Sequence, residues 1–107
     1  MLDAMADKLK ADTCSRYLKG LADPERLKIV ERLQGGPLSV SQLTAALKSE
    51  LANVSHHLSV LKNAGLVTSR RRGKNIYYSL NPKVFSHRKR SGDSLNFGCC
   101  RVVLKSR

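Results

Sequence analysis

The chain has 107 residues, enough for one compact domain and too few for a multidomain protein. Lysine and arginine number 20 against 8 acidic residues, a formal net charge of +12, and tryptophan is absent. The apolar stretches are too short for a transmembrane helix, and charges interrupt the N-terminus where a signal peptide is apolar, so we expect a cytoplasmic protein. Three cysteines, an odd number, are atypical of a disulfide scaffold.

The positive charge is concentrated in the second half of the chain. Residues 1–50 contain eight basic and seven acidic residues, whereas residues 51–107 contain twelve basic residues and one acid, Asp93. A surface of one sign attracts polyanions, so this half is predicted to bind nucleic acid. The alternatives are a basic tail without a partner and a site for an anionic membrane. The membrane is disfavoured because no basic amphipathic helix with large apolar anchors is present.

Two helices are predicted in the first 36 residues. Apolar residues recur at helical spacing over residues 2–21 in two stripes, and two stripes suggest two packing partners, one of them a second subunit. The stripes are Leu2, Met5 and Leu9, followed by Cys14, Leu18 and Leu21. The second helix is predicted to begin at Pro24 with Asp23 as its N-cap, and to end at Gly35. Its inward-facing residues are expected to be Leu27, Val30 and Leu33.

A third and a fourth helix follow closely. Ser39 and Gln42 fit a capping box at the start of the third, which is expected to bury Val40, Leu43 and Leu47. After a break at residues 48–50, the fourth helix continues to residues 63–65. Its apolar residues are three, four and three apart and form one stripe: Leu51, Val54, Leu58 and Leu61. Its other surface is polar and free of acids: Asn53, Ser55, His56, Ser59 and Lys62.

From residue 66 the apolar period changes to two. Residues 66–72 and 75–80 are predicted to be two strands joined by a turn at residues 72–75. The tip of this hairpin is strongly basic, with Arg70, Arg71, Arg72 and Lys74. Residues 86–94 are expected to be a flexible basic linker, and the alternation in residues 95–105 favours a further strand over a helix.

This order of elements is typical of a winged helix-turn-helix. The fourth helix is narrow and polar enough to enter the major groove, and the basic hairpin after it can contact phosphates or the minor groove. We therefore predict a mainly α fold with a small β-hairpin and room for an extra C-terminal strand. Residues 1–85 form the DNA-binding domain, with a dimerisation helix (1–21), a helix-turn-helix (39–64) and a wing (66–80). Residues 86–107 form the basic linker and a cysteine-containing segment.

Three segments resemble the ArsR/SmtB family of dimeric winged-helix repressors over about residues 15–82. They are LKGLADPERLKIVERLQGG, LSVSQLTAAL and, the most specific, NVSHHLSVLKNAGLVTSRRRGKNIYYSL. The resemblance implies a homodimer that occupies a palindromic DNA operator and is released by a metal ion or another inducer. It also implies that Ser55 and His56 meet DNA from the recognition helix and that the tip of the wing contacts the DNA backbone.

The chain departs from this family at its metal sites. Members that bind soft metals near the third helix have Cys-x-Cys where this chain has Ser39-Val40-Ser41, and hydroxyls are poor ligands for soft ions. A second familiar site uses Asp and His pairs on a last helix, whereas this C-terminus has only His87 and Asp93. The recognition helix also starts with Leu51 where many members have a polar residue. Base contacts are therefore expected from Asn53, Ser55, His56 and Ser59, together with apolar contact.

The cysteines are the remaining candidates for binding a soft metal or metalloid ion. Cys99 and Cys100 are adjacent, and neighbours on a strand point to opposite faces, so they do not readily chelate one ion together. Cys14 with one C-terminal cysteine, within or between subunits, is a plausible pair. The simpler interpretation is that all three are small buried residues with inert thiols. Catalysis is not predicted, because no nucleophile–base set, paired carboxylates or glycine-rich phosphate loop is visible, and the one cofactor considered is a soft metal or metalloid ion bound by the thiols.

The preferred interpretation is a homodimeric repressor that binds double-stranded DNA at a palindromic site. One alternative is a thiol-based protein that handles metals or redox chemistry through Cys14, Cys99 and Cys100, with an incidental basic half. Another is a structural RNA-associated protein, which leaves the order of helices and hairpin unexplained.

Overall fold

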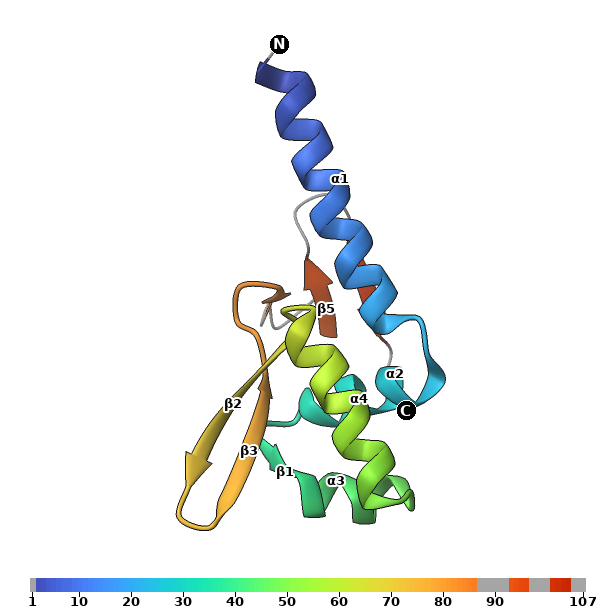
Figure 1. Cartoon of the computed structure of the whole chain (residues 1–107), viewed down its shortest axis with the longest axis vertical. Helices are drawn as coiled ribbons and strands as arrows, with labels where there is room; N and C mark the ends of the chain where they lie inside the picture. Colours follow the sequence, from blue (N-terminus) through green and yellow to red (C-terminus); the bar gives the residue numbers. More distant parts are fainter. Residues whose placement is uncertain (1, 87–92, 97–100, 105–107) are drawn as a thin grey trace.

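The computed structural model describes residues 2–86, 93–96 and 101–104, with side chains for residues 11–84. Within these ranges the chain forms four helices and two small three-stranded sheets (Figure 1). The helices are α1 (Leu2–Leu21), α2 (Pro24–Leu33), α3 (Val40–Leu47) and α4 (Leu51–Asn63). The strands are β1 (Leu38–Ser39), β2 (Val67–Arg72), β3 (Asn75–Leu80), β4 (Phe85–Ser86), β5 (Asp93–Asn96) and β6 (Arg101–Leu104). The structure is a winged helix-turn-helix, as predicted.

The first sheet is antiparallel, in the order β1-β3-β2. Its main part is the predicted hairpin, in which Val67 pairs with Leu80 at the base and Arg72 with Asn75 at the tip. The two-residue loop between these strands starts with Gly73 at φ 62°, a left-handed conformation that favours glycine. Strand β1 was not predicted, because two residues are too few to show an alternating pattern.

The second sheet, β4-β5-β6, corrects two expectations for the C-terminal segment. Ser86 and residues 93–94 belong to strands, so the predicted linker 86–94 is at most residues 87–92, which lie outside the described residues. The stretch expected as one strand contributes to two antiparallel strands, in which Leu95 pairs with Val102.

Local hydrogen bonds start α2 and α3 where the sequence predicts. The Asp23 carboxylate accepts hydrogen bonds from the backbone N–H groups of Glu25 (2.8 Å) and Arg26 (3.2 Å). At α3 the Gln42 N–H donates to Ser39 Oγ and the Ser39 N–H donates to Gln42 Oε1, which completes the predicted capping box. Both helix starts are therefore fixed by side chains within three residues of the cap.

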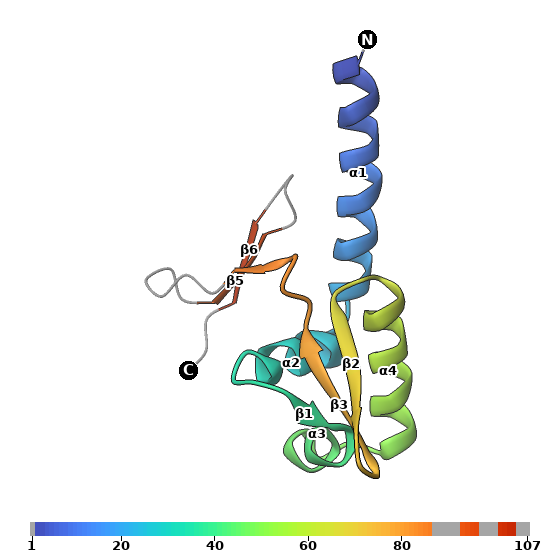
Figure 2. The same cartoon turned by 90° about the vertical axis from the view of Figure 1, so that its left-hand side faces the viewer.

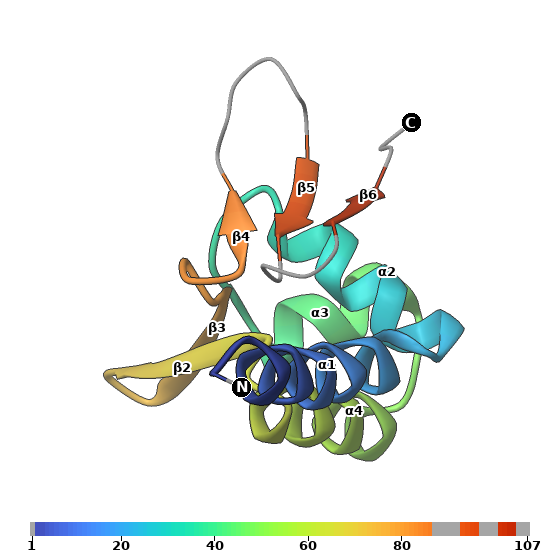
Figure 3. The same ribbon diagram turned by 90° about the horizontal axis from the view of Figure 1, so that it is seen from above.

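The core lies between the helices and the inner face of the first sheet. Figure 3 shows α1, α2, α3 and α4 gathered on one side of the hairpin. Leu27 was expected inside but is 37% exposed, and Ile29 is fully buried in its place beside Val30. The buried apolar residues are Cys14, Leu21, Ile29, Val30, Leu33, Leu43, Val54, Leu58, Leu61, Ala64, Leu66, Val67, Leu80 and Val84.

Among the described side chains of α1, those near its C-terminal end pack on the core. A Cβ on Gly20 would lie 2.9 Å from Leu66 Cδ1 and 3.0 Å from the Ala64 Cβ, so the missing side chain lets α1 approach the end of α4. The molecule measures 49 × 29 × 26 Å, and the N-terminal half of α1 extends beyond the body along the long axis (Figures 1 and 2). Leu18, expected on a buried stripe with Cys14, is 45% exposed. Among the described residues, no helix is long and apolar enough to cross a bilayer.

Candidate nucleic-acid interface

The helix-turn-helix places the start of α4 and the tip of the wing at one end of the molecule. Helix α3 ends at Leu47, and the left-handed φ of 53° at its C-cap Lys48 lets the chain turn before Leu51. In Figures 1 and 2 the N-terminal end of α4 and the β2–β3 loop lie opposite the projecting end of α1. A straight duplex that crosses this end can therefore meet both the helix and the hairpin.

The four residues predicted to contact bases lie on the exposed side of α4. Asn53, Ser55, His56 and Ser59 are all exposed, while Val54, Leu58 and Leu61 are fully buried. Leu51 is the exception to the predicted buried stripe, because its side chain is 56% exposed. It is the first residue of the helix, so it lies at the edge of the area that neighbouring elements cover.

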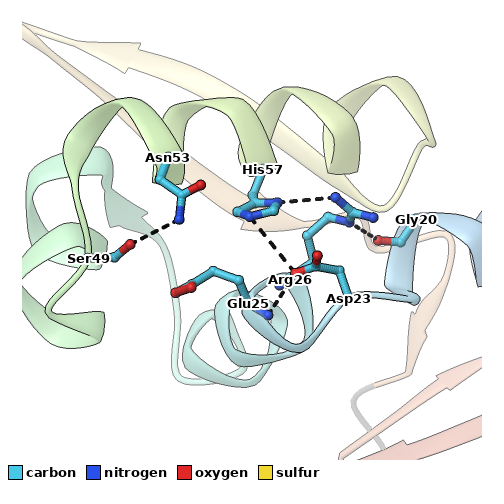
Figure 4. Close-up of polar contacts among 7 residues, drawn as sticks. All are labelled: Gly20, Asp23, Glu25, Arg26, Ser49, Asn53 and His57. Carbon is cyan, nitrogen blue, oxygen red and sulfur yellow. Dashed lines mark hydrogen bonds and ion pairs between the residues drawn. The ribbon is translucent and has the colours of Figure 1, made fainter.

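Asn53 is held by a neighbour in the turn. Its Nδ2 donates a hydrogen bond to Ser49 Oγ at 3.2 Å (Figure 4). An asparagine amide has two N–H donors and an acceptor oxygen, so this contact leaves capacity for a base edge. The Ser49 contact therefore restricts the orientation of the amide in the predicted interface.

The wing separates its basic residues onto two faces. Because neighbours on a strand alternate, Arg70 and Arg72 share a face with Tyr77, which pairs with Arg70, and a pocket on that face includes all three side chains. Arg71 lies on the other face, where its Nε donates to the Gly73 carbonyl at 3.4 Å. Lys62 Nζ donates to Ser69 Oγ at 2.7 Å and joins α4 to the hairpin. We did not predict this contact, because it joins two different elements.

The charge around these elements is almost entirely positive. No aspartate or glutamate occurs from Leu51 to Gly92, and Glu50, at the start of α4, is exposed. Within residues 11–84 no ion pair neutralises the wing cations, Arg70, Arg71, Arg72 and Lys74. These side chains are exposed and available to phosphate groups.

A polar network joins the buried side of α4 to α2 and α1 (Figure 4). His57 is 8% exposed, and its Nδ1 lies 3.1 Å from Arg26 Nη1, while Arg26 Nε donates to the Gly20 carbonyl at 2.7 Å. The His57 Nε2 lies 3.9 Å from Asp23 Oδ1. We expected His57 only on the flank of the helix, because no local pattern shows a partner 31 residues away.

The pKa of Asp23 reflects this network. Partial desolvation raises it, but the N–H donors of Arg26 and Glu25 and the charges of His57 and Arg26 together lower it more. The net result is a pKa below the ordinary value of 3.8.

The predicted metal ligands are only partly described. Cys14 is 6% exposed and is disulfide-bonded, which differs from the free thiol expected from an odd number of cysteines. Cys99 and Cys100 lie outside the described residues. Among the residues that are described, no three His, Cys, Asp or Glu side chains are grouped to hold a metal ion. His56 and His57 point differently, one exposed and one buried, with ring planes tilted by 54°.

The chain is similar to known bacterial regulators. It is 46% identical over 77 residues to the HTH-type transcriptional regulator NmtR of Mycobacterium tuberculosis, covering 72% of this chain and 64% of NmtR. It is 35% identical over 83 residues to the transcriptional repressor SdpR of Bacillus subtilis, covering 78% of this chain and 86% of SdpR. The chain thus spans slightly less than two-thirds of NmtR and most of SdpR.

A solved structure shows the same fold. The solution structure of a homodimeric winged helix-turn-helix DNA-binding domain from Mycobacterium bovis, a possible ArsR-family regulator, has a TM-score of 0.65 and 34% identity, covering 68% of each chain. The sequence profile of bacterial regulatory proteins of the arsR family matches residues 23–69, from the Asp23 cap of α2 into β2. The chain belongs to the arsR family of bacterial regulatory proteins.

Proposed function

We propose that this protein is a DNA-binding transcriptional regulator of the cytoplasm that represses genes as a homodimer on a palindromic site. The observation that supports this most directly is the pairing of an acid-free exposed face on α4 with an unpaired basic wing at one end of the molecule. Asn53, Ser55, His56 and Ser59 would contact base edges, and Arg70, Arg71, Arg72 and Lys74 would contact phosphates.

The proposed dimer uses α1. Its N-terminal half extends beyond the body (Figure 1). Leu18 on α1 and Leu27 on α2 are large apolar side chains that the single chain leaves exposed. A two-fold dimer buries such surface on both subunits. The M. bovis domain, which is homodimeric, supports a homodimer here. Two recognition helices on one dimer explain why the site would be palindromic.

We further propose that an inducer acts through the cysteines, with Cys14, Cys99 and Cys100 as ligands for a soft metal or metalloid ion or as targets of an oxidant. Cys14 lies buried on α1, the helix proposed to hold the dimer together. A change at this sulfur could alter the spacing of the two recognition helices. The cysteines offer thiolates only when reduced, because a disulfide sulfur is not a thiolate ligand.

Fluorescence anisotropy with the duplex upstream of the protein's own gene tests the proposed function. A shuffled duplex of the same composition is the control. We expect tighter binding to the upstream duplex, and affinities for both that fall steeply with salt. Equal affinity for the two duplexes would contradict a sequence-specific regulator, and binding independent of salt would contradict the basic interface.

A further inference from the structure

Leu51 is an apolar side chain in an otherwise polar interface. It is 56% exposed, more than any of the other large exposed apolar residues among the described side chains, whereas Leu58 and Leu61 further along α4 are fully buried. Burial in the core therefore does not explain a leucine at this position. Nor does the proposed dimer, because Leu51 is at the end of the molecule opposite the projecting half of α1 (Figure 1).

The surroundings of Leu51 allow close approach to a groove. At about 100° per residue, Leu51 is on the same flank of α4 as Ser55 and Lys62, and Asn53 is on the other flank. The middle of the exposed side has the small side chains of Ala52 and Ser59 beside His56. In helix-turn-helix proteins the N-terminal residues of the recognition helix are the ones that contact base edges. Leu51, the first residue of α4, has that position.

We propose that Leu51 contacts the 5-methyl group of a thymine in each half-site and thereby specifies that base. This inference rests on the proposed function. Leucine has no donor or acceptor, so it cannot recognise a base through hydrogen bonds. The thymine methyl is the apolar group that standard bases present in the major groove, and contact between the two removes apolar surface from water. No other standard base has this methyl group, so a different base at that position removes the apolar contact and leaves the leucine side chain exposed to water.

The test removes the methyl group without changing base pairing. The purified protein first selects its preferred duplexes from a randomised pool. Each thymine of the selected site is then replaced by deoxyuridine, one symmetric pair of positions at a time, and affinity is measured for the parent protein and for Leu51→Ala. Ile76→Ala is the matched control, because it shortens an exposed apolar side chain on the wing.

We expect one symmetric pair of thymines at which deoxyuridine weakens binding of the parent by about fourfold for each half-site, or about sixteenfold in all. Leu51→Ala should bind the thymine and deoxyuridine duplexes equally, while Ile76→Ala should discriminate as the parent does. A second outcome is that a sequence is selected while each deoxyuridine replacement reduces the affinity of the parent and of Leu51→Ala by the same factor. In that case the proposed thymine contact of Leu51 is wrong and the proposed function stands. If no sequence is selected, both are wrong.

Discussion

Arg26 Nη1 lies 3.1 Å from His57 Nδ1 and joins α2 to the recognition helix. A guanidinium can only donate, so Nδ1 is the acceptor in this hydrogen bond, and Nε2 is the ring nitrogen that faces Asp23. The other side of Arg26 is held by the carbonyl of Gly20 near the end of α1. One arginine thus ties the proposed dimerisation helix to the helix proposed to contact bases.

Replacing His57 by leucine should destabilise the protein. The variant removes the acceptor for Arg26 Nη1 in a largely buried place, at a cost of about 1–3 kcal/mol in the free energy of unfolding. His57→Asn is the matched control, because its side-chain oxygen can take the place of Nδ1 and accept from Arg26. Urea unfolding should give a lower midpoint for leucine than for asparagine, with unchanged slopes. Equal midpoints would mean that the hydrogen bond contributes nothing.

Asp23 should make stability depend on pH in the acid range. Its pKa is lower in the folded chain than its ordinary value of 3.8, so the unfolded chain binds the proton more readily. The carboxylate therefore adds stability above the unfolded pKa, and this is lost as the pH falls through the folded pKa. Asp23→Asn keeps a good N-cap but does not titrate there. The stability of the parent relative to this variant should begin to fall below about pH 5 and continue to fall through the folded pKa, and a constant difference would contradict the assignment.

The sequence predicted what depends on neighbours along the chain. The Asp23 cap, the Ser39–Gln42 capping box and the hairpin turn at residues 72–75 need only residues within a few positions, and the structure confirms them. Which apolar residues are covered could not be predicted in the same way. Leu18, Leu27 and Leu51 have helical spacing but are exposed, because the spacing shows a stripe and not how far neighbouring elements extend. The Arg26–His57 contact joins distant positions and has no local pattern.

The proposed dimer can be tested at Leu18. A charge introduced by Leu18→Asp would have to be buried in the interface, so we expect this variant to sediment as a monomer where the parent is a dimer. The same result is expected for Met5→Asp combined with Leu9→Asp. Leu51→Asp is the control, because it adds the same charge at the opposite end of the molecule and should leave the dimer intact. A parent that sediments as a monomer at micromolar concentration would contradict the proposal.

The wing and the recognition helix should contribute to DNA binding in different ways. Arg70→Ala with Arg72→Ala, and separately Arg71→Ala or Lys74→Ala, should weaken binding to all duplexes and reduce the log–log salt slope by about 0.9 for each lost phosphate contact. Ser55→Ala or His56→Ala should leave the slope unchanged and reduce discrimination by about 1–3 kcal/mol for each lost base contact. Wing variants that bind DNA with the affinity and salt slope of the parent would contradict the proposed contact between the hairpin and DNA.

Sensing through the cysteines predicts that the response of DNA binding depends on redox state. Cys14 is disulfide-bonded in the structure, so soft metal ions should release DNA only from protein that has first been reduced. Peroxide should act on the reduced protein by forming the disulfide. Operator affinity is measured with arsenite, zinc or peroxide for the parent and for Cys14→Ser, Cys99→Ser, Cys100→Ser and the triple variant. We expect Cys14→Ser to abolish the peroxide response and the triple variant to respond to none of the three. A triple variant that responds like the parent, or a reduced parent that responds to none, would show that the sulfurs are structural.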